Sequence, residues 1–128
     1  GKKPQVLIVG CGSLLHNALV AAKELDTKGV SSVVLNMHTI KPLDEDTILK
    51  LAKTCKAVVT VEEHQVHGGL GGAVAEVLAR ELPTPIEFIG MQDVFGESGQ
   101  PHELLERYGM GVKDIVRAAE RVIRRKKK

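Results

Sequence analysis

Four side chains that could bind a metal or take part in a reaction lie within six residues near the middle of the chain. They are the carboxylates of Glu62 and Glu63 and the imidazoles of His64 and His67. Groups of these types bind divalent metals or transfer protons. Their spacing differs from the helical H-E-x-x-H arrangement, in which two histidines share one face, and no further cluster of ligands supports a metal site. The favoured interpretation is structural, since acidic residues just before a helix N-terminus stabilise its dipole.

Glycines follow these four residues and support the same interpretation. They stand at four of the next five positions, as Gly68, Gly69, Gly71 and Gly72. Glycine permits a tight turn and lets a neighbouring backbone approach closely. We therefore predict that Glu62–Gly72 is a helix entry and a protein-contact element, and not a metal or catalytic site.

A second glycine turn, near the start of the chain, is a candidate for binding an anion. Gly10, Gly12 and Ser13 follow an apolar run and precede a helical pattern. The free N–H groups of a helix N-terminus would face a ligand there. The turn lacks the third glycine of a dinucleotide-binding fingerprint and the lysine of a P-loop. A steric role in a tight turn is therefore favoured over a phosphate site.

His38 and Lys41 belong to a third polar segment. Pro42 restricts Lys41 to extended geometry, so the segment is interpreted as a rigid connection that carries surface charge. Both side chains remain candidates for an interface or a ligand-binding edge, together with the residues above. No Ser/His/Asp or Cys/His set of the kind that activates a nucleophile stands out in the sequence.

The hydrophobic pattern predicts the scaffold that carries these segments. Short apolar runs indicate four strands, at Gln5–Gly10, Ser32–Asn36, Ala57–Val61 and Ile86–Ile89. The first two runs suit strands that are buried on both faces. Apolar residues at helical spacing lie between the strands, and two further helices are expected at Glu103–Arg107 and across 112–123.

This alternation predicts an α/β fold. We expect a three-layer α/β/α sandwich whose four parallel strands have the order second, first, third, fourth. Right-handed crossovers then place helices on both faces of the sheet. The carboxyl ends of the strands meet at one edge, where ligands and partners gather in such sheets. The segments 10–13, 36–44 and 62–72 all reach this edge.

Local signals define the ends and faces of the helices. Gly29 is a natural stop for the first helix, and Asp44 is the expected N-cap of the second. The buried face of the first helix is predicted to contain five apolar residues, Leu15, Ala18, Leu19, Ala22 and Leu25.

Length and composition suit one globular domain. The chain has 128 residues, of which 43% are hydrophobic, and only Phe88, Phe95 and Tyr108 are aromatic. The core must therefore be built from Val, Ile, Leu and Ala, and few rings are left to stack on nucleic-acid bases. We expect a single domain, residues 1–128, within a longer chain, because the sequence starts at Gly1 without an initiator methionine.

Charge is distributed unevenly. The formal net charge is +2, and subtracting the five basic residues Arg124 to Lys128 leaves −3. We interpret this tail as a solvated, frayed helix end and not as a nucleic-acid site. Cys11 and Cys55 are expected to be small core residues. No apolar run reaches membrane-spanning length and no signal peptide is visible, so a cytoplasmic protein without a membrane partner is expected.

Three longer strings carry a resemblance to a known family. VLNMHTIKPLD at 34–44, VTVEEHQVHGGLGGAVAEVLA at 59–79 and QDVFGESGQPHELLERYGM at 92–110 resemble the C-terminal domain of transketolases, especially the split bacterial and archaeal kind. The similarity extends from about Val6 to Ile123 in consistent order. Related domains form the C-terminal parts of 1-deoxyxylulose-5-phosphate synthase and of the beta subunits of 2-oxoacid decarboxylases.

The resemblance implies a larger enzyme that moves a two-carbon ketol unit between sugar phosphates, as in the pentose phosphate pathway. It implies thiamine diphosphate and magnesium in that enzyme, both held by other domains or by an N-terminal partner subunit, in a homodimeric assembly. This sequence lacks the G-D-G motif of the metal–diphosphate site. No catalytic, cofactor-binding or metal residue is therefore expected on this chain, and the isolated chain is expected to be inactive.

The resemblance also implies a role in subunit assembly and an extra antiparallel edge strand from preceding residues. Two alternatives remain open from the sequence. One is the corresponding domain of either related enzyme. The other is a free-standing module that binds a small anion at the edge formed by segments 10–13 and 62–72.

Overall fold

The computed structural model describes residues 3–10, 15–37, 43–63, 69–91 and 111–126. The strands are β1 (Val6–Gly10), β2 (Ser32–Asn36), β3 (Val58–Glu63) and β4 (Ile86–Met91). The helices are α1 (Leu15–Thr27), α2 (Glu45–Cys55), α3 (Leu70–Glu81) and α5 (Val112–Arg125). The predicted alternation of strands and helices is therefore confirmed. The expected helix at Glu103–Arg107 lies outside the described residues.

The sheet has the predicted topology. Its four strands are parallel and follow the order β2-β1-β3-β4. Val6 pairs with Ser32 in β2, and Leu7 pairs with Val58 in β3. The expected α/β class and strand order are confirmed. The described residues add no antiparallel edge strand to these four.

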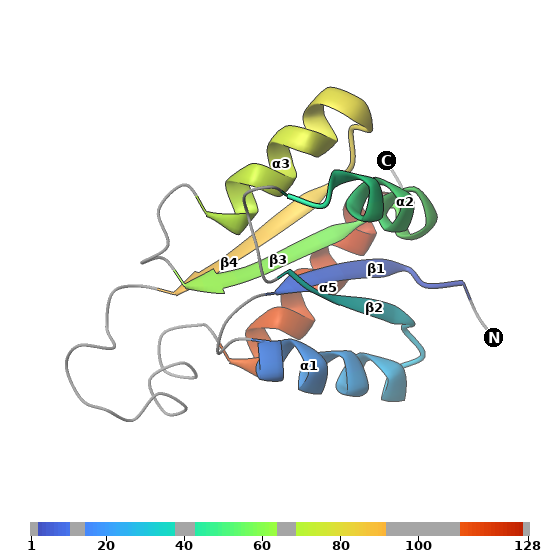
Figure 1. Ribbon diagram of the computed structural model, residues 1–128. Coiled ribbons are helices and arrows are strands. Elements are labelled where there is room, and N and C mark those ends of the chain that lie inside the picture. Colours follow the sequence, from blue (N-terminus) through green and yellow to red (C-terminus); the bar gives the residue numbers. More distant parts are fainter. Residues whose placement is uncertain (1–2, 11–14, 38–42, 64–68, 92–110, 127–128) are drawn as a thin grey trace.

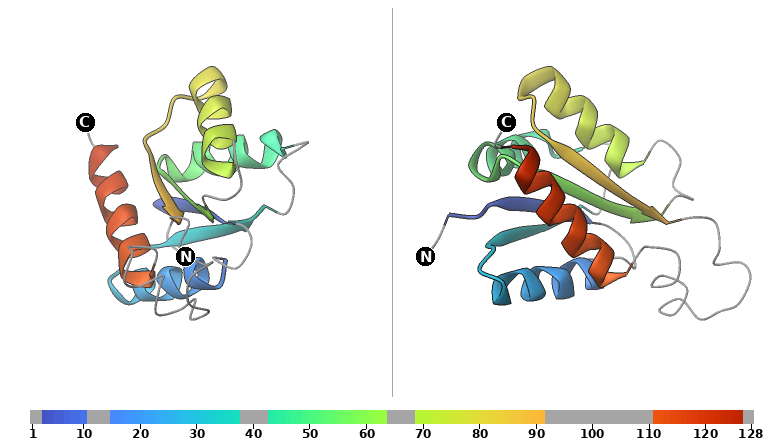
Figure 2. Two further views of the ribbon diagram at one scale, coloured as in Figure 1. Left: turned by 90° about the vertical axis from the view of Figure 1, so that its left-hand side faces the viewer. Right: turned by 180° about the vertical axis from the view of Figure 1, so that it is seen from behind.

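Helices cover both faces of the sheet and form two hydrophobic layers (Figure 1). In that view α2 and α3 lie above the sheet and α1 lies below it, and the view from behind shows α5 crossing the strands on the side of α1 (Figure 2). Alternate strand residues point to opposite faces. Ile8 and Val59 pack with α1 and α5, whereas Leu7 and Val58 pack with α2 and α3.

Two predictions about burial are wrong. Ser32–Asn36 was expected to be buried on both faces, but β2 is an edge strand and its residues are half-buried or exposed. Leu19 was expected on the buried face of α1, but it is 49% exposed. The buried stripe of α1 consists of Asn17, Ala18, Ala21 and Leu25, and its small alanines bring the helix close to α5. Leu19 lies beside this stripe, toward solvent.

The helix ends follow the expected local chemistry. Gly29 has a φ of 81°, a left-handed conformation that glycine adopts without strain, and it ends the turn after α1. Asp44 is the N-cap of α2, as predicted. Its carboxylate accepts hydrogen bonds from the Thr47 backbone N–H at 3.2 Å and from the Thr47 hydroxyl at 2.8 Å.

Candidate functional site

The carboxyl ends of the strands meet at one edge of the sheet, as the fold requires. Gly10 at the end of β1 pairs with Asn36 of β2 on one side and with Val61 of β3 on the other. The chain then leaves β2 along this edge, where the Met37 N–H donates to the Gly10 carbonyl at 2.9 Å. The structure thus brings together the starting points of all three segments that the sequence singled out.

Of the two candidate glutamates Glu62 and Glu63, the structure describes the side chain of Glu62, which closes the N-terminus of α3. Its carboxylate accepts a hydrogen bond from the Leu70 N–H at 2.7 Å and another from the Gly71 N–H at 2.5 Å. The N-cap residue of this helix, Gly69, has no side chain to fill that role. A carboxylate from the end of β3 therefore satisfies two N–H groups that the first turn leaves open.

Gly71 allows this close approach between strand and helix. A methyl group at this position would lie 2.7 Å from Glu62 Oε2 and 2.8 Å from Phe88 Cδ1. It would also lie 3.1 Å from the hydroxyl of Thr60, which is fully buried and has no hydrogen-bond partner among the described residues. At Gly72, by contrast, an added methyl group would meet nothing within 4 Å. Only the first of these neighbouring glycines is required sterically.

Phe88 exposes an apolar surface beside this contact. It faces the same side of the sheet as Thr60, its neighbour across the β3–β4 pair, and it is 54% exposed. Neither Thr60 nor Phe88 was predicted to be a site residue. Their strand positions, alternating with residues that face α5, were the available signal.

Several predicted site residues lie outside the described part of the chain. They are Gly12, Ser13, His38, Lys41, His64, His67 and Gly68, and the side chain of Glu63 is also not described. Their assignment to an interface or a ligand edge remains a prediction. Among the described residues, no group of three or more His, Cys, Asp or Glu side chains is placed to hold a metal ion.

Cys55 is a core residue, as predicted, and Cys11 lies outside the described residues. Burial raises the pKa of the Cys55 thiol, and the nearby ammonium group of Lys126 lowers it by a smaller amount. The neutral thiol therefore predominates at neutral pH, which does not suit a nucleophile.

The described part of the basic tail, Arg124 to Lys126, differs from its prediction. It was interpreted as a solvated, frayed end, but α5 extends to Arg125 and the next side chain is fixed. The Lys126 ammonium group donates to the carbonyls of Gln5 and Cys55, each at 2.9 Å. Arg125 binds the Ile86 carbonyl and the Glu87 carboxylate, both at 2.9 Å.

Among the residues that the structure describes, no helix is long and apolar enough to cross a membrane.

Comparison with known proteins yields a consistent set of similarities. The model of the family "Transketolase, C-terminal domain" matches residues 1–115. The chain is 46% identical over 121 residues to the 6-deoxy-6-sulfo-D-fructose transketolase subunit SqwH of a Clostridium species, covering 94% of this chain and 38% of that protein. It is 39% identical to a 1-deoxy-D-xylulose-5-phosphate synthase of Desulfitobacterium hafniense, covering 91% of this chain and 19% of that enzyme.

A solved structure agrees with the sequence matches. The structure described as "Split gene transketolase, inactive beta4 tetramer" superposes with a TM-score of 0.86 at 44% identity, covering 96% of this chain and 40% of that one. Transketolase from Pichia stipitis, at 18% identity and a TM-score of 0.69, shares the fold. The chain thus spans two fifths or less of the length of these relatives.

Proposed function

Because this chain belongs to the transketolase C-terminal domain family, we propose that it is the C-terminal structural and assembly domain of a thiamine-diphosphate-dependent transketolase. In this proposal residues 1–128 form one domain of the enzyme. The remaining domains or an N-terminal subunit supply the catalytic centre, and the whole enzyme transfers two-carbon ketol units between sugar phosphates. Split relatives that this chain matches over nearly its whole length support a separate partner subunit.

The closure of two helix N-termini by the chain's own carboxylates carries the proposal of an assembly role. Asp44 occupies the N-terminus of α2, and Glu62 occupies that of α3. A free helix N-terminus at the carboxyl edge of a parallel sheet would suit a phosphate group. The N–H groups of Thr47, Leu70 and Gly71 already have carboxylate partners, so a phosphate added at either helix would meet negative charge. This arrangement favours a protein-contact role for segment 62–72 over a small-anion module.

The described residues do not fit thiamine diphosphate or its metal. Among the described residues, no cluster of side chains is placed to bind the metal. The N-termini of α2 and α3 each have a carboxylate from this chain where a diphosphate would bind. In the proposed enzyme, thiamine diphosphate supplies the electron sink for breaking and forming the carbon–carbon bond, and magnesium accompanies it on other domains. Residues of this chain act there by holding those domains in place.

Reconstitution tests the division of labour. The chain alone is compared with its complex with the N-terminal subunit, or with the full-length protein, in calorimetry with thiamine diphosphate and magnesium and in a coupled ketol-transfer assay. We expect cofactor binding and turnover only in the complete assembly. Micromolar cofactor binding by the chain alone would contradict the proposal.

Substitutions at the proposed contact element test the assembly role. Gly69→Leu adds bulk at the entry to α3 and should weaken subunit association, measured by sedimentation in the full enzyme. Ala79→Leu, at an exposed position on the same helix, is the matched control and should leave association unchanged. His67→Ala should leave turnover within a few-fold of the native value. A hundredfold loss of turnover with association intact would identify a chemical site instead.

A synthase of 1-deoxyxylulose 5-phosphate is the second candidate for the whole enzyme. The observation that favours it is the 39% identity to such a synthase across 119 residues. The coupled assay separates the two, because the synthase forms 1-deoxyxylulose 5-phosphate, whereas a transketolase moves a ketol unit between sugar phosphates. The higher identity to the split transketolase subunit favours ketol transfer.

A further inference from the structure

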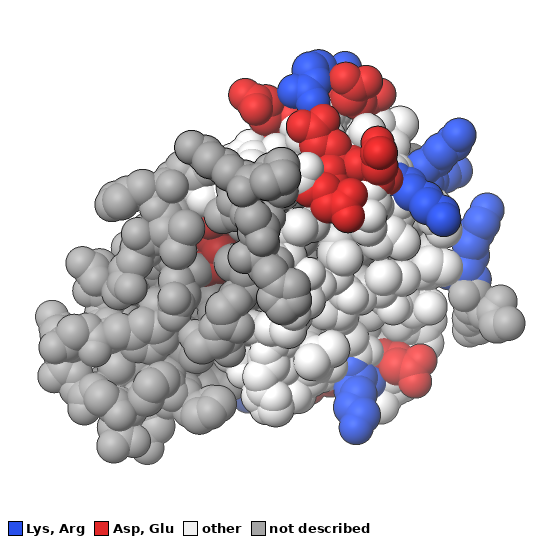
Figure 3. Space-filling model, viewed as in Figure 1, with Lys and Arg blue, Asp and Glu red and all other residues white. Residues whose placement is uncertain are grey.

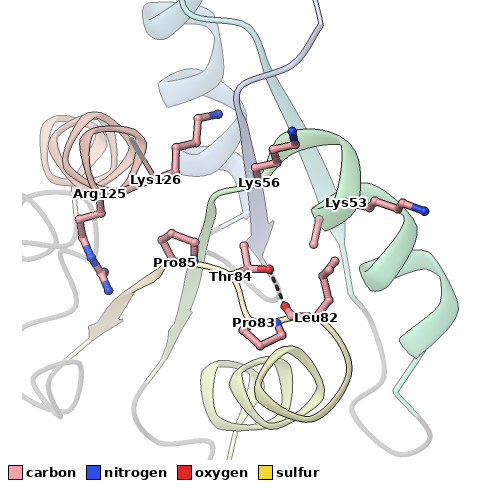
Figure 4. A pocket seen from close by; sticks show the side chains of 9 residues that line it. Lys53, Lys56, Leu82, Pro83, Thr84, Pro85, Arg125 and Lys126 are labelled. Atoms are coloured by element: carbon pink, nitrogen blue, oxygen red, sulfur yellow. Dashed lines mark hydrogen bonds between the residues drawn. The ribbon is translucent and has the colours of Figure 1, made fainter. Parts of the chain in front are cut away.

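A basic hollow lies at the opposite end of the sheet from the candidate site, where the strands begin. Its volume is about 440 Å³, within the range of small-molecule sites. Three parts of the chain enclose it: the end of α2, the link between α3 and β4, and the end of α5 (Figure 4). Ala52, Leu82, Pro83 and Pro85 give it an apolar floor.

The charged residues that line this hollow are all cations. Figure 4 shows Arg125, Lys126, Lys56 and Lys53 in an arc around Pro85 and Leu82, with the flexible side chain of Lys53 extending outward. A second hollow of about 340 Å³ shares Lys56 and Lys126 and adds Lys3. Lys and Arg side chains are also visible on the surface at the end of the molecule near the N-terminus, whereas Asp and Glu side chains gather over α2 and α3 (Figure 3).

Structural requirements use only part of this positive charge. The helices α2, α3 and α5 end here, and each helix C-terminus corresponds to about half a negative charge. Glu87 neutralises one further cation, since it binds Arg125 at 2.9 Å while also binding Arg121 at 3.0 Å. The four lining cations together exceed these negative contributions, and the surplus lies on the exposed lysines.

Lys56 is held in a backbone conformation that costs free energy. Its φ of 64° is left-handed, and it is the only described residue other than glycine with a positive φ. Glycine would end α2 there without strain, whereas a residue with a side chain is strained in this conformation. The chain thus retains a cation beside the hollow at a position where the helix itself favours glycine.

We propose that this hollow binds a small phosphorylated molecule with a compact apolar body. The apolar floor receives the body, and Lys53 and Lys56 receive the phosphate. The available cations favour phosphate over a carboxylate, because the guanidinium of Arg125 is engaged by Glu87 and the Ile86 carbonyl. Recognition is then left to lysines, which act as point charges on flexible stems and suit a doubly charged tetrahedral group.

Phenyl phosphate is a suitable probe. Phenol and inorganic phosphate are the controls, since each contains one of its two parts, the apolar ring or the phosphate group. Binding is measured by titration calorimetry on the full-length assembled protein at low ionic strength. Phenyl phosphate should bind at least tenfold more tightly than either half. Raising the salt concentration should weaken the binding, since the lysines are exposed to screening. A crystal soaked in phenyl phosphate should show it between Lys53, Lys56 and Pro85.

Two charge-matched double variants locate the effect. Lys53→Gln with Lys56→Gln should weaken phenyl phosphate binding at least tenfold. Lys50→Gln with Lys113→Gln removes the same charge from exposed positions outside the hollow and should change binding less than twofold. The native soak gives an answer even if a variant folds poorly. Equal weakening by both pairs, equal binding of phenol or of inorganic phosphate, or a soaked crystal with an empty hollow would each overturn the proposal.

Discussion

The two ends of the sheet treat the helix termini that meet there differently. At the carboxyl end, one carboxylate serves each described N-terminus of the α2–α3 layer, as Asp44 does for α2 and Glu62 for α3. At the amino end, the lining cations outnumber what the helix C-termini require. The first end is electrostatically closed by groups of the chain itself, which suits packing. The second end retains unused charge, which suits an anionic ligand.

The largest expected effect comes from removing the closure at α3. Glu62→Ala leaves the N–H groups of Leu70 and Gly71 without the charged partner and should lower the free energy of unfolding by about 2–3 kcal/mol. Glu62→Gln keeps one oxygen acceptor and should cost about half as much. Chemical denaturation of both variants checks this. If Glu62→Ala is as stable as the native protein, the Glu62 carboxylate does not stabilise the N-terminus of α3, and the carboxyl end of the sheet is not closed in the way described.

A pair of adjacent glycines gives the next effect. Gly71→Ala forces a methyl group against Glu62 and Phe88 and should destabilise the fold by about 1–2 kcal/mol. Gly72→Ala meets no atom and should stabilise α3 by up to about 1 kcal/mol through helix propensity. The Gly71→Ala penalty should shrink in the Glu62→Ala background, because one clashing group is then absent. Opposite signs for the two glycines are the decisive outcome.

At the amino end, Lys126→Met tests the contribution of one cation to structure. The substitution keeps much of the aliphatic stem but removes the hydrogen bonds to Gln5 and Cys55, so a loss of about 1 kcal/mol is expected. Thermal unfolding measures it, with Arg124→Met as a neighbouring exposed control. If Lys126→Met lowers the stability no more than Arg124→Met does, the hydrogen bonds of Lys126 contribute nothing and the original prediction of a frayed helix end is correct.

The smallest effect has the opposite sign. Lys56→Gly relieves the left-handed conformation after α2 and should stabilise the fold by about 0.5–1 kcal/mol. Lys53→Gly serves as a contrast, because Lys53 lies within the last turn of α2 and glycine there should destabilise by about 1 kcal/mol. If Lys56→Gly destabilises the protein, the Lys56 side chain is needed for the fold. The amino end of the sheet then has less positive charge to spare for a ligand than proposed.

Periodicity and turn chemistry predicted most of the fold. The strands, their order and the N-cap Asp44 follow from local patterns and from the constraints on parallel sheets. The mistakes concern positions in the assembled fold: Ser32–Asn36 has the apolar pattern of a central strand but lies at an edge of the sheet. Leu19 has helical spacing, yet the close packing of Ala18 and Ala21 determines which stripe is buried.

The role of Glu62 at the start of α3 was predicted in kind but not in geometry. The sequence indicated that acidic residues before α3 favour its dipole. It did not reveal that the carboxylate of Glu62 contacts helix residues eight and nine positions later, because that contact depends on how β3 and α3 pack. The amino-end hollow was not predicted, since Lys53, Lys56 and Lys126 come from separate segments that only the tertiary fold brings together.

The position of α5 constrains when the fold can be completed during synthesis. This helix packs on β1, β3, β4 and α1, yet it is made after all of them. Until it has left the ribosome, much of the hydrophobic face containing Ile8 and Val59 has no cover. Until residues 112–125 have emerged, the nascent chain therefore exposes the part of this face that α5 covers, and during that time it is most open to chaperone binding and to aggregation.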